Sequence, residues 1–302
     1  REDMVATADK YFDKTAFYDY RALSTIGFDI GSADSLTQTD GVKYAQGGIS
    51  QGVIQLLSDG RESVVVTYSL LDNINIPDLV EGRMPENDRE CVVDSKRYGS
   101  EYIGKEFVVS ESNTDDTKDA FTYDTYTIVG RVQSPLYLNF ERGTSSVGNG
   151  SVSGFAYFMR SAYTAEYDNE IYVRMDCDDA AYSDEYNSYI DAHTDAIEDA
   201  VSKLATARYD RIYSESADEI AKARTQLEED ITDAQADLDE AYDTLQKSEE
   251  ELNKNQQELD DNRKAMELMG ISTDGIFDDA QAQLDAAKEQ IDAGYAEYNE
   301  GV

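Results

Sequence analysis

The sequence predicts an α+β protein in which a mixed-sheet core lobe precedes a long antiparallel α-helical coiled-coil hairpin. Short runs rich in β-branched and aromatic residues recur through the first two hundred residues, which is typical of strands. Apolar residues then recur at helical spacing, and from Ile220 to Met269 this spacing is a heptad that reverses at Gly270. We therefore expect a core domain at residues 1–204 and a coiled-coil hairpin at residues 205–302.

Both arms of the predicted hairpin alternate large and small residues. On the first arm, one heptad row holds large residues: Ile231, Leu238, Leu245, Leu252, Leu259 and Met266. The row three residues later is mostly small or polar: Ala234, Ala241, Ser248, Asn255, Asn262 and Met269. On the second arm the large row is followed by the small row: Phe277, Leu284, Ile291 and Tyr298, then Ala280, Ala287 and Gly294. This alternation favours antiparallel packing, because large side chains of one helix can lie opposite small ones of the other.

The turn between the arms is predicted near residues 270–276. Gly270 suits the left-handed residue that ends a helix, and Thr273 or Asp274 can accept hydrogen bonds from the first amides of the next helix. Apolar residues at this tip are the candidate contacts with a partner: Met269, Ile271, Ile276 and Phe277.

The two arms differ in length. The first has about 50 residues and the second about 25 before Val302, so we expect a truncated descending arm and an ascending arm partly without a partner. Unpaired apolar positions near Leu238 and Leu245 would promote self-association. Around Ser214 two alternatives stay open, namely one long helix with a stutter or two helices that meet there.

The lobe is predicted to begin with a helix, because Met4, Ala8, Tyr11 and Phe12 share one helical face. A further short helix is expected at residues 32–40. Strands are expected at 18–28, 42–57, 61–71, 91–93, 107–109, 121–132, 155–159 and 171–175. This order indicates an α+β lobe and not a series of βαβ units.

The charge balance restricts the choice of partners. The formal net charge is −38, and both halves of the chain are acidic. Such a surface repels phosphates, so we expect no binding of nucleic acid. Neither a membrane-spanning segment nor a signal peptide is recognisable in the sequence. Cys91 and Cys177 are the only cysteines, and the sequence leaves open whether they form a disulfide.

We find no pattern that predicts catalysis, a cofactor or a metal. His193 has no serine or cysteine constellation around it, and the glycine-rich run at 143–154 lacks the features of a phosphate-binding loop. The aspartate clusters at 115–119 and 176–179 lack the EF-hand pattern. The chain is therefore expected not to be an enzyme.

Several motifs in the first two hundred residues resemble those of one family. They are Tyr11-Phe12-Asp13, Arg21-Ala22-Leu23-Ser24-Thr25-Ile26-Gly27-Phe28, Glu81-Gly82-Arg83-Met84-Pro85, Glu90-Cys91-Val92-Val93, Ile128-Val129-Gly130, Ser134-Pro135-Leu136-Tyr137, Arg142-Gly143, Gly148-Asn149-Gly150 and Gly154-Phe155. In this order they resemble the extracytoplasmic, MacB-like core domain of FtsX-like ABC transporter permeases. Residues 205–302 resemble the acidic coiled-coil insertion found in Gram-positive members.

The resemblance implies a role at the cell membrane, with this domain on the extracytoplasmic face. It implies a permease subunit that a cytoplasmic ABC ATPase drives through membrane helices, which this sequence lacks. The domain would relay ATP-driven motion to an extracellular protein or substrate that the sequence does not identify. The alternative is a cell-surface adhesin or scaffold, in which the coil only binds or spaces.

Overall fold

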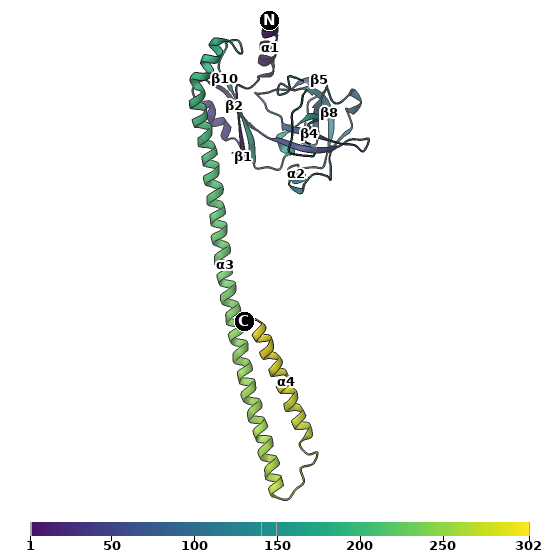
Figure 1. Ribbon diagram of the computed structural model, residues 1–302, viewed down its shortest axis with the longest axis vertical. Helices are drawn as coiled ribbons and strands as arrows, with labels where there is room; N and C mark the ends of the chain where they lie inside the picture. Colours follow the sequence, from purple (N-terminus) through teal and green to yellow (C-terminus); the bar gives the residue numbers. More distant parts are fainter. Residues whose placement is uncertain (1, 140, 149, 302) are drawn as a thin grey trace. The chain divides into compact units, whose positions relative to one another are not determined.

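The computed structural model describes residues 2–139, 141–148 and 150–301, and the chain divides into two compact units, residues 1–213 and 214–302. In chain order the elements are α1 (Glu2–Thr15), β1 (Tyr20–Asp29), η1 (Ser32–Gln38), β2 (Val42–Gly48), β3 (Ser50–Leu56), β4 (Glu62–Ser69), β5 (Asp78–Gly82), β6 (Glu90–Asp94), η2 (Ser100–Tyr102), β7 (Glu106–Val109), α2 (Asp115–Asp119), β8 (Thr125–Gln133), β9 (Gly154–Phe158), η3 (Arg160–Ala162), β10 (Tyr167–Met175), α3 (Asp184–Leu268) and α4 (Asp278–Gly301). The predicted α+β class is confirmed, with a small antiparallel sheet and a larger mixed sheet followed by two long helices that pack together (Figure 1).

A small antiparallel sheet in the first unit carries the start of α3. Strand β10 lies between β1 and β2, and its apolar side chains alternate toward one face. Ile171, Val173 and Met175 are at most 2% exposed, and they pack with Phe28 and with Ile197 of α3. The first turns of α3 are therefore part of the core of this unit.

The larger sheet closes into a ring. Its strand order is β5-β8-β6-β9-β4-β3-β7, and β7 also pairs with β8. The pairs β4–β9 and β6–β8 are parallel and the others antiparallel, so the sheet is mixed, as predicted. Closure leaves fewer strand edges exposed. The interior is filled by side chains that include Val53, Val65, Phe107, Tyr126 and Phe158.

Two of the family-like motifs meet where β5 pairs with β8, a strand of this ring. Gly82 on β5 lies opposite Gly130 on β8, and a Cβ on Gly130 would be 2.4 Å from the carbonyl oxygen of Arg83. Only glycine allows the two backbones to approach so closely. These two glycines therefore allow β5 to pack closely against β8. The motif Glu81–Pro85 begins in this sheet, because its first two residues belong to β5.

Other strand predictions are confirmed with shifted ends. The predicted strand at 121–132 begins at Thr125, and Phe121 forms only an isolated bridge to Tyr163. The region 42–57 contains two strands, β2 and β3, because the chain leaves the small sheet and enters the ring around Ile49. The short helix α2 was not predicted; the hydroxyl of Thr114 accepts a hydrogen bond from the amide of Thr117 at its start.

Helix α3 is a single helix from Asp184 to Leu268, so of the two alternatives around Ser214 the two-helix one is wrong.

Near the end of the first unit, two arginines of α3 bind one carboxylate of the lobe. Arg208 Nη1 lies 2.8 Å from an oxygen of Asp29, and Arg211 also pairs with Asp29. These ion pairs attach this part of α3 to the end of β1.

The second unit is the predicted helical hairpin, in which α3 and α4 run side by side (Figure 1). The large row faces inward over most of its length, and Leu259 is only 9% exposed. A Cβ on Gly294 would lie 2.5 Å from Leu245, so a small residue does face a large one there. This contact matches the antiparallel packing expected from the alternation.

One row of the predicted seam is wrong near the tip. Asn255 and Asn262 are exposed, whereas Gln256 and Arg263 are half-buried. The inward positions there follow the large row by four residues instead of three. Positions three and four residues after a member of the large row lie on neighbouring faces of the helix, so the sequence pattern alone did not distinguish them.

Candidate functional site

The candidate partner contacts lie at the turn of the hairpin, whose backbone ends α3 by a defined motif. Gly270 has a φ of +74°, and the amide of Ile271 donates to the carbonyl oxygen of Met266 at 3.0 Å. This bond and the left-handed glycine form a Schellman ending, as the sequence predicted for Gly270. The chain therefore turns sharply at a fixed position.

The predicted start of the second arm needs a correction. Helix α4 begins at Asp278, so Thr273 and Asp274 lie too early to be its cap. The carbonyl oxygen of Thr273 accepts from the amide of Ile276 at 3.2 Å instead, and the carboxylate of Asp274 accepts from the hydroxyl of Ser272 at 3.1 Å. Both residues thus stabilise the loop, which is longer than the sequence suggested.

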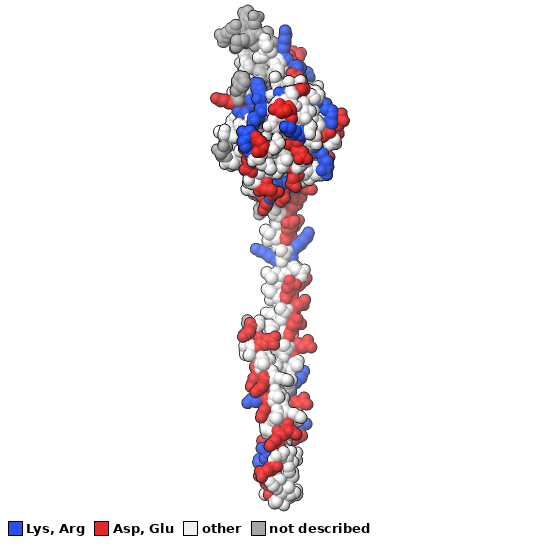
Figure 2. All heavy atoms as spheres, turned by 90° about the vertical axis from the view of Figure 1, so that its right-hand side faces the viewer, with Lys and Arg blue, Asp and Glu red and all other residues white. Residues whose placement is uncertain are grey.

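Several apolar side chains are exposed at the tip. Met269 is 73% exposed, Ile276 55% and Ile271 46%. Leu268 is 89% exposed and belongs to this group, although the sequence did not single it out. We call these four residues the tip patch. In Figure 2 the end of the hairpin is mostly uncharged, while acidic side chains follow the helices behind it.

Phe277 differs from the other candidate contacts, because it is half-buried between the arms. The guanidinium carbon of Arg263 lies 5.7 Å from the centre of its ring, within reach of a cation–π interaction. Phe277 is therefore better described as a member of the large row of the second arm than as an exposed contact at the tip. Met269, Ile271 and Ile276 are thus exposed at the tip, whereas Phe277 is half-buried.

The four side chains of the tip patch are aliphatic or thioether groups, which neither transfer protons nor act as nucleophiles. Within the described residues, no cluster of three or more histidine, cysteine or acidic side chains is arranged to hold a metal ion. Cys91 is buried and Cys177 half-buried, and both are free thiols. None of the described helices has an apolar stretch long enough to cross a membrane.

Comparison with known proteins gives structural similarity but no sequence family. No family model matches the sequence, and no curated protein matches it. One similar structure is the extracellular domain of the noncanonic ABC-type transporter YknZ from Gram-positive bacteria. The similarity covers 57% of this chain and 87% of that chain, with 11% sequence identity and a TM-score of 0.35. Another is the periplasmic region of MacB from Actinobacillus actinomycetemcomitans. Here the similarity covers 59% of this chain and 76% of that chain, with 12% sequence identity and a TM-score of 0.34.

Proposed function

We propose that this chain is the extracytoplasmic part of an ABC permease subunit, anchored in the cell membrane of a Gram-positive bacterium. Residues 1–204 would form the core domain, and residues 205–302 would carry the contact with an extracellular partner. The order of the family-like motifs in the lobe supports this assignment. The cytoplasmic ATPase would act through membrane helices that lie outside this sequence, and the chain would perform no catalysis of its own.

The observation that carries the mechanism is the continuity of α3. The helix contributes Ile197, 3% exposed, to the core beneath the small sheet, and it ends at Leu268 in the tip patch. A displacement of the lobe can pass along an unbroken helix, whereas a flexible linker would absorb it. The pairs from Arg208 and Arg211 to Asp29 would transmit the force near the exit from the lobe.

The tip patch is tested in the intact transporter by adding charge. We expect Met269→Glu combined with Ile271→Glu to reduce transport-coupled function about tenfold, because a charged tip cannot bury against an apolar partner. ATP hydrolysis should persist. Gln257→Glu, at an exposed position on the same hairpin, is the matched control and should behave like the wild type. Unchanged function in the double variant would reject the tip as the contact.

The relay is tested separately at the lobe. Asp29→Ala removes the partner of both arginines and should uncouple transport from ATP hydrolysis while the tip stays intact. Lys203→Ala is the control, because Lys203 pairs with Asp199 on the surface of the same helix. If Asp29→Ala transports normally, the force does not pass through this attachment.

The second candidate function is a cell-surface adhesin or scaffold. The exposed tip patch favours it as well, because a binding surface needs no ATPase. The two functions differ in what flanks the chain in its gene. Four membrane spans and a neighbouring ATPase gene support the permease, and a cell-wall anchor supports the adhesin.

Self-association is part of the same proposal, but the exposed apolar residues that would carry it differ from those that the sequence predicted. Leu238 and Leu245 are half-covered by α4, so they are not the unpaired positions that the sequence predicted. Upstream on α3, Ile220, Leu227 and Ile231 are 50–59% exposed and continue the heptad of the α3–α4 contact. A second copy would pair along this stripe. Sedimentation should show concentration-dependent dimers that Leu227→Glu abolishes, and a strict monomer would contradict the pairing.

A further inference from the structure

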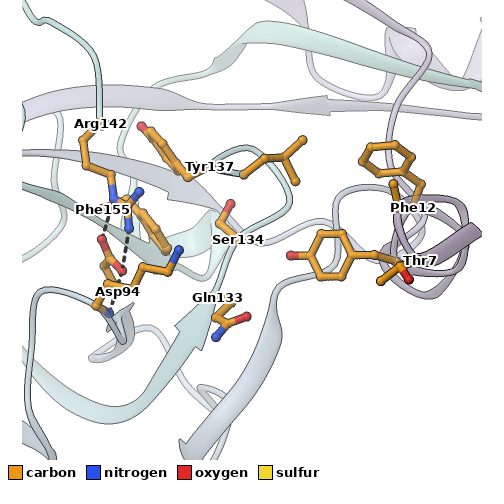
Figure 3. A pocket seen from close by; sticks show the side chains of 12 residues that line it. Thr7, Phe12, Asp94, Gln133, Ser134, Tyr137, Arg142 and Phe155 are labelled. Atoms are coloured by element: carbon orange, nitrogen blue, oxygen red, sulfur yellow. Dashed lines mark hydrogen bonds and ion pairs between the residues drawn. The ribbon is translucent and has the colours of Figure 1, made fainter. Parts of the chain in front are cut away.

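The first unit contains a cavity of about 430 Å³ where α1, the chain that follows it and the start of α3 meet. Its volume is within the range of sites that hold small organic molecules. Phe12 of α1 also borders a larger cavity, which Figure 3 shows with Phe12 on one side and Tyr137 and Phe155 on the other. We call the smaller cavity, which Phe12, Asp19 and Tyr186 line, the α1–α3 cavity.

Five aromatic side chains of the lining form a continuous series. The ring centres of Tyr18 and Phe17 are 4.6 Å apart, and those of Phe17 and Phe12 are 4.9 Å apart. The series continues over 6.3 Å from Phe12 to Tyr182 and over 6.4 Å from Tyr182 to Tyr186. Because the faces of aromatic rings carry partial negative charge, a cavity with rings from several segments suits an organic cation.

Tyr182 is held in this series by an unusual backbone conformation. Its φ is +67°, which residues other than glycine and asparagine rarely adopt. Its side chain is 72% exposed, so burial of the ring does not account for this strain. Strained backbone of this kind is found most often at functional sites, where it positions a side chain. Here it keeps the ring of Tyr182 in contact with Phe12 and Tyr186.

Carboxylates outnumber basic groups in the lining. Among the described lining residues, Arg174 is the one basic side chain, and four are acidic: Asp9, Asp13, Asp19 and Asp179. Arg174 Nη2 lies 2.9 Å from a carboxylate oxygen of Asp13, so these two charges cancel. The described lining therefore has a formal charge of −3, which favours a positively charged ligand.

Two of the remaining carboxylates are oriented by neutral donors. Asp19 accepts hydrogen bonds from the amide of Met175 at 2.6 Å and from the hydroxyl of Tyr186 at 2.5 Å. Asp9 accepts from the amide of Ala181 at 2.9 Å. Neutral donors fix the position of a carboxylate without cancelling its charge, so both groups can still attract a cation.

The arrangement favours an organic cation over a metal ion. Divalent metal ions need several oxygen ligands within about 2.0–2.6 Å. In the part of the chain that the structure describes, no three histidine, cysteine or acidic side chains are arranged to supply them. An alkylated ammonium group needs no such shell, because it is attracted by aromatic faces and by carboxylates at longer range.

We propose that the α1–α3 cavity binds a small organic cation with an alkylated ammonium group, such as choline. Its methyl groups lie against the rings of Phe12, Tyr182 and Tyr186, and its charge lies toward Asp9 and Asp19. No step of the proposed relay requires this ligand, so the two proposals stand or fall separately.

The first experiment tests the charge of the ligand by titrating the purified chain, followed through the NMR signals of the ligand's methyl groups. We expect choline to bind at least about tenfold more tightly than 3,3-dimethylbutan-1-ol, which has the same shape and no charge. Phosphocholine should also bind at least about tenfold more weakly than choline, because its phosphate meets the acidic lining. Choline that binds no better than these two compounds, or not at all, overturns the proposal.

The second experiment tests the aromatic series. Tyr182→Gly removes the ring and accepts the left-handed backbone, so the dissociation constant of choline should rise about fivefold. Tyr182→Phe keeps the ring and should bind like the wild type. Tyr209→Ala, which removes an exposed ring of α3 outside the lining, is the control. Near-ultraviolet circular dichroism confirms that the variants are folded. Unchanged binding by Tyr182→Gly would show that the rings do not hold the cation.

The third experiment separates the lining from the overall charge of the protein. Asp179→Asn should weaken choline binding about threefold, because Asp179 borders the cavity. Asp178→Asn removes the same charge from the neighbouring exposed residue, which is outside the lining, and should have a smaller effect. If the two variants bind choline equally, the lining does not select the cation and the proposed site is wrong.

Discussion

The ring of the lobe and the seam of the hairpin bury their apolar side chains to very different degrees. Inside the ring, Val53, Val65, Phe107 and Phe158 are completely buried. In the described part of the hairpin, Leu259 is the one apolar side chain that is buried, at 9% exposure. Two helices alone cannot surround a side chain, whereas a closed sheet can. The stability of the ring is therefore concentrated in its interior, while that of the hairpin is spread thinly along the seam.

The largest expected effect tests this difference by truncation. Phe158→Ala should destabilise the lobe by about 3–5 kcal/mol, because its ring contacts four aromatic neighbours edge to face: Phe107, Phe121, Tyr126 and Tyr163. Leu259→Ala in the hairpin should cost about 2 kcal/mol, at the low end for leucine, since its surroundings can close over the gap.

Hydrogen exchange followed by mass spectrometry separates the two results. Peptides from β9 should lose protection in the Phe158 variant, and peptides from residues 252–266 should lose it in the Leu259 variant. Loss of protection across both units in either variant would show that the ring and the seam unfold as one body, and the contrast would then be wrong.

A backbone contact of the ring gives the next effect. Gly130→Ala should destabilise the lobe by about 2 kcal/mol, because the added Cβ would meet the backbone oxygen of Arg83 at 2.4 Å. Thr127→Ala, at an exposed position of the same strand, is the control in thermal unfolding. A Gly130 variant that melts with the control would mean that β5 moves away from β8 at little cost.

The sequence predicted the hairpin more fully than the lobe, because the seam is a local pattern and the closure of the ring is not. The seam is a local pattern, so the rows of Leu245 and Gly294 could be placed from their spacing alone. The closure of the ring depends on the pairing of β7 with both β3 and β8, which no local pattern encodes. At the tip, Met269, Ile271 and Ile276 were singled out by their apolar character, and all three are exposed, while their contact with a partner stays a prediction. Leu268 was not singled out, because it lies in neither of the two heptad rows.

A polar pair within the seam sharpens the comparison further. Gln256 and Gln281 exchange hydrogen bonds of 3.1 and 3.0 Å across the helices, and each amide nitrogen also donates to an aspartate on its own helix. Gln256→Ala should cost about 1 kcal/mol, because the amide of Gln281 loses its partner across the seam. Gln257→Ala, which is exposed, is the control.

The double variant Gln256→Leu with Gln281→Leu tests what the pair does. It should raise the melting temperature of the hairpin, since apolar side chains replace half-buried amides. It should also permit other registers of the two helices, which crosslinking of cysteines introduced along α3 and α4 would reveal. A single register in the stabilised double variant would show that the size alternation of the seam fixes the alignment without the glutamines.

The smallest expected effect lies at the surface of the lobe and depends on pH. Arg83 binds both oxygens of Glu90, at 2.6 and 2.5 Å, and this pairing lowers the pKa of Glu90 from its ordinary 4.5 to about 2. Because the folded-state pKa is the lower one, the stabilisation is complete above about pH 4.5 and disappears as the pH falls toward 2. Urea midpoints of the wild type and Glu90→Gln should therefore differ at pH 7 and converge near pH 2. Because Arg83 is itself exposed, added salt should reduce the difference between the two urea midpoints at pH 7. A difference between the midpoints that persists at pH 2 would show that the glutamine acts through packing instead of charge.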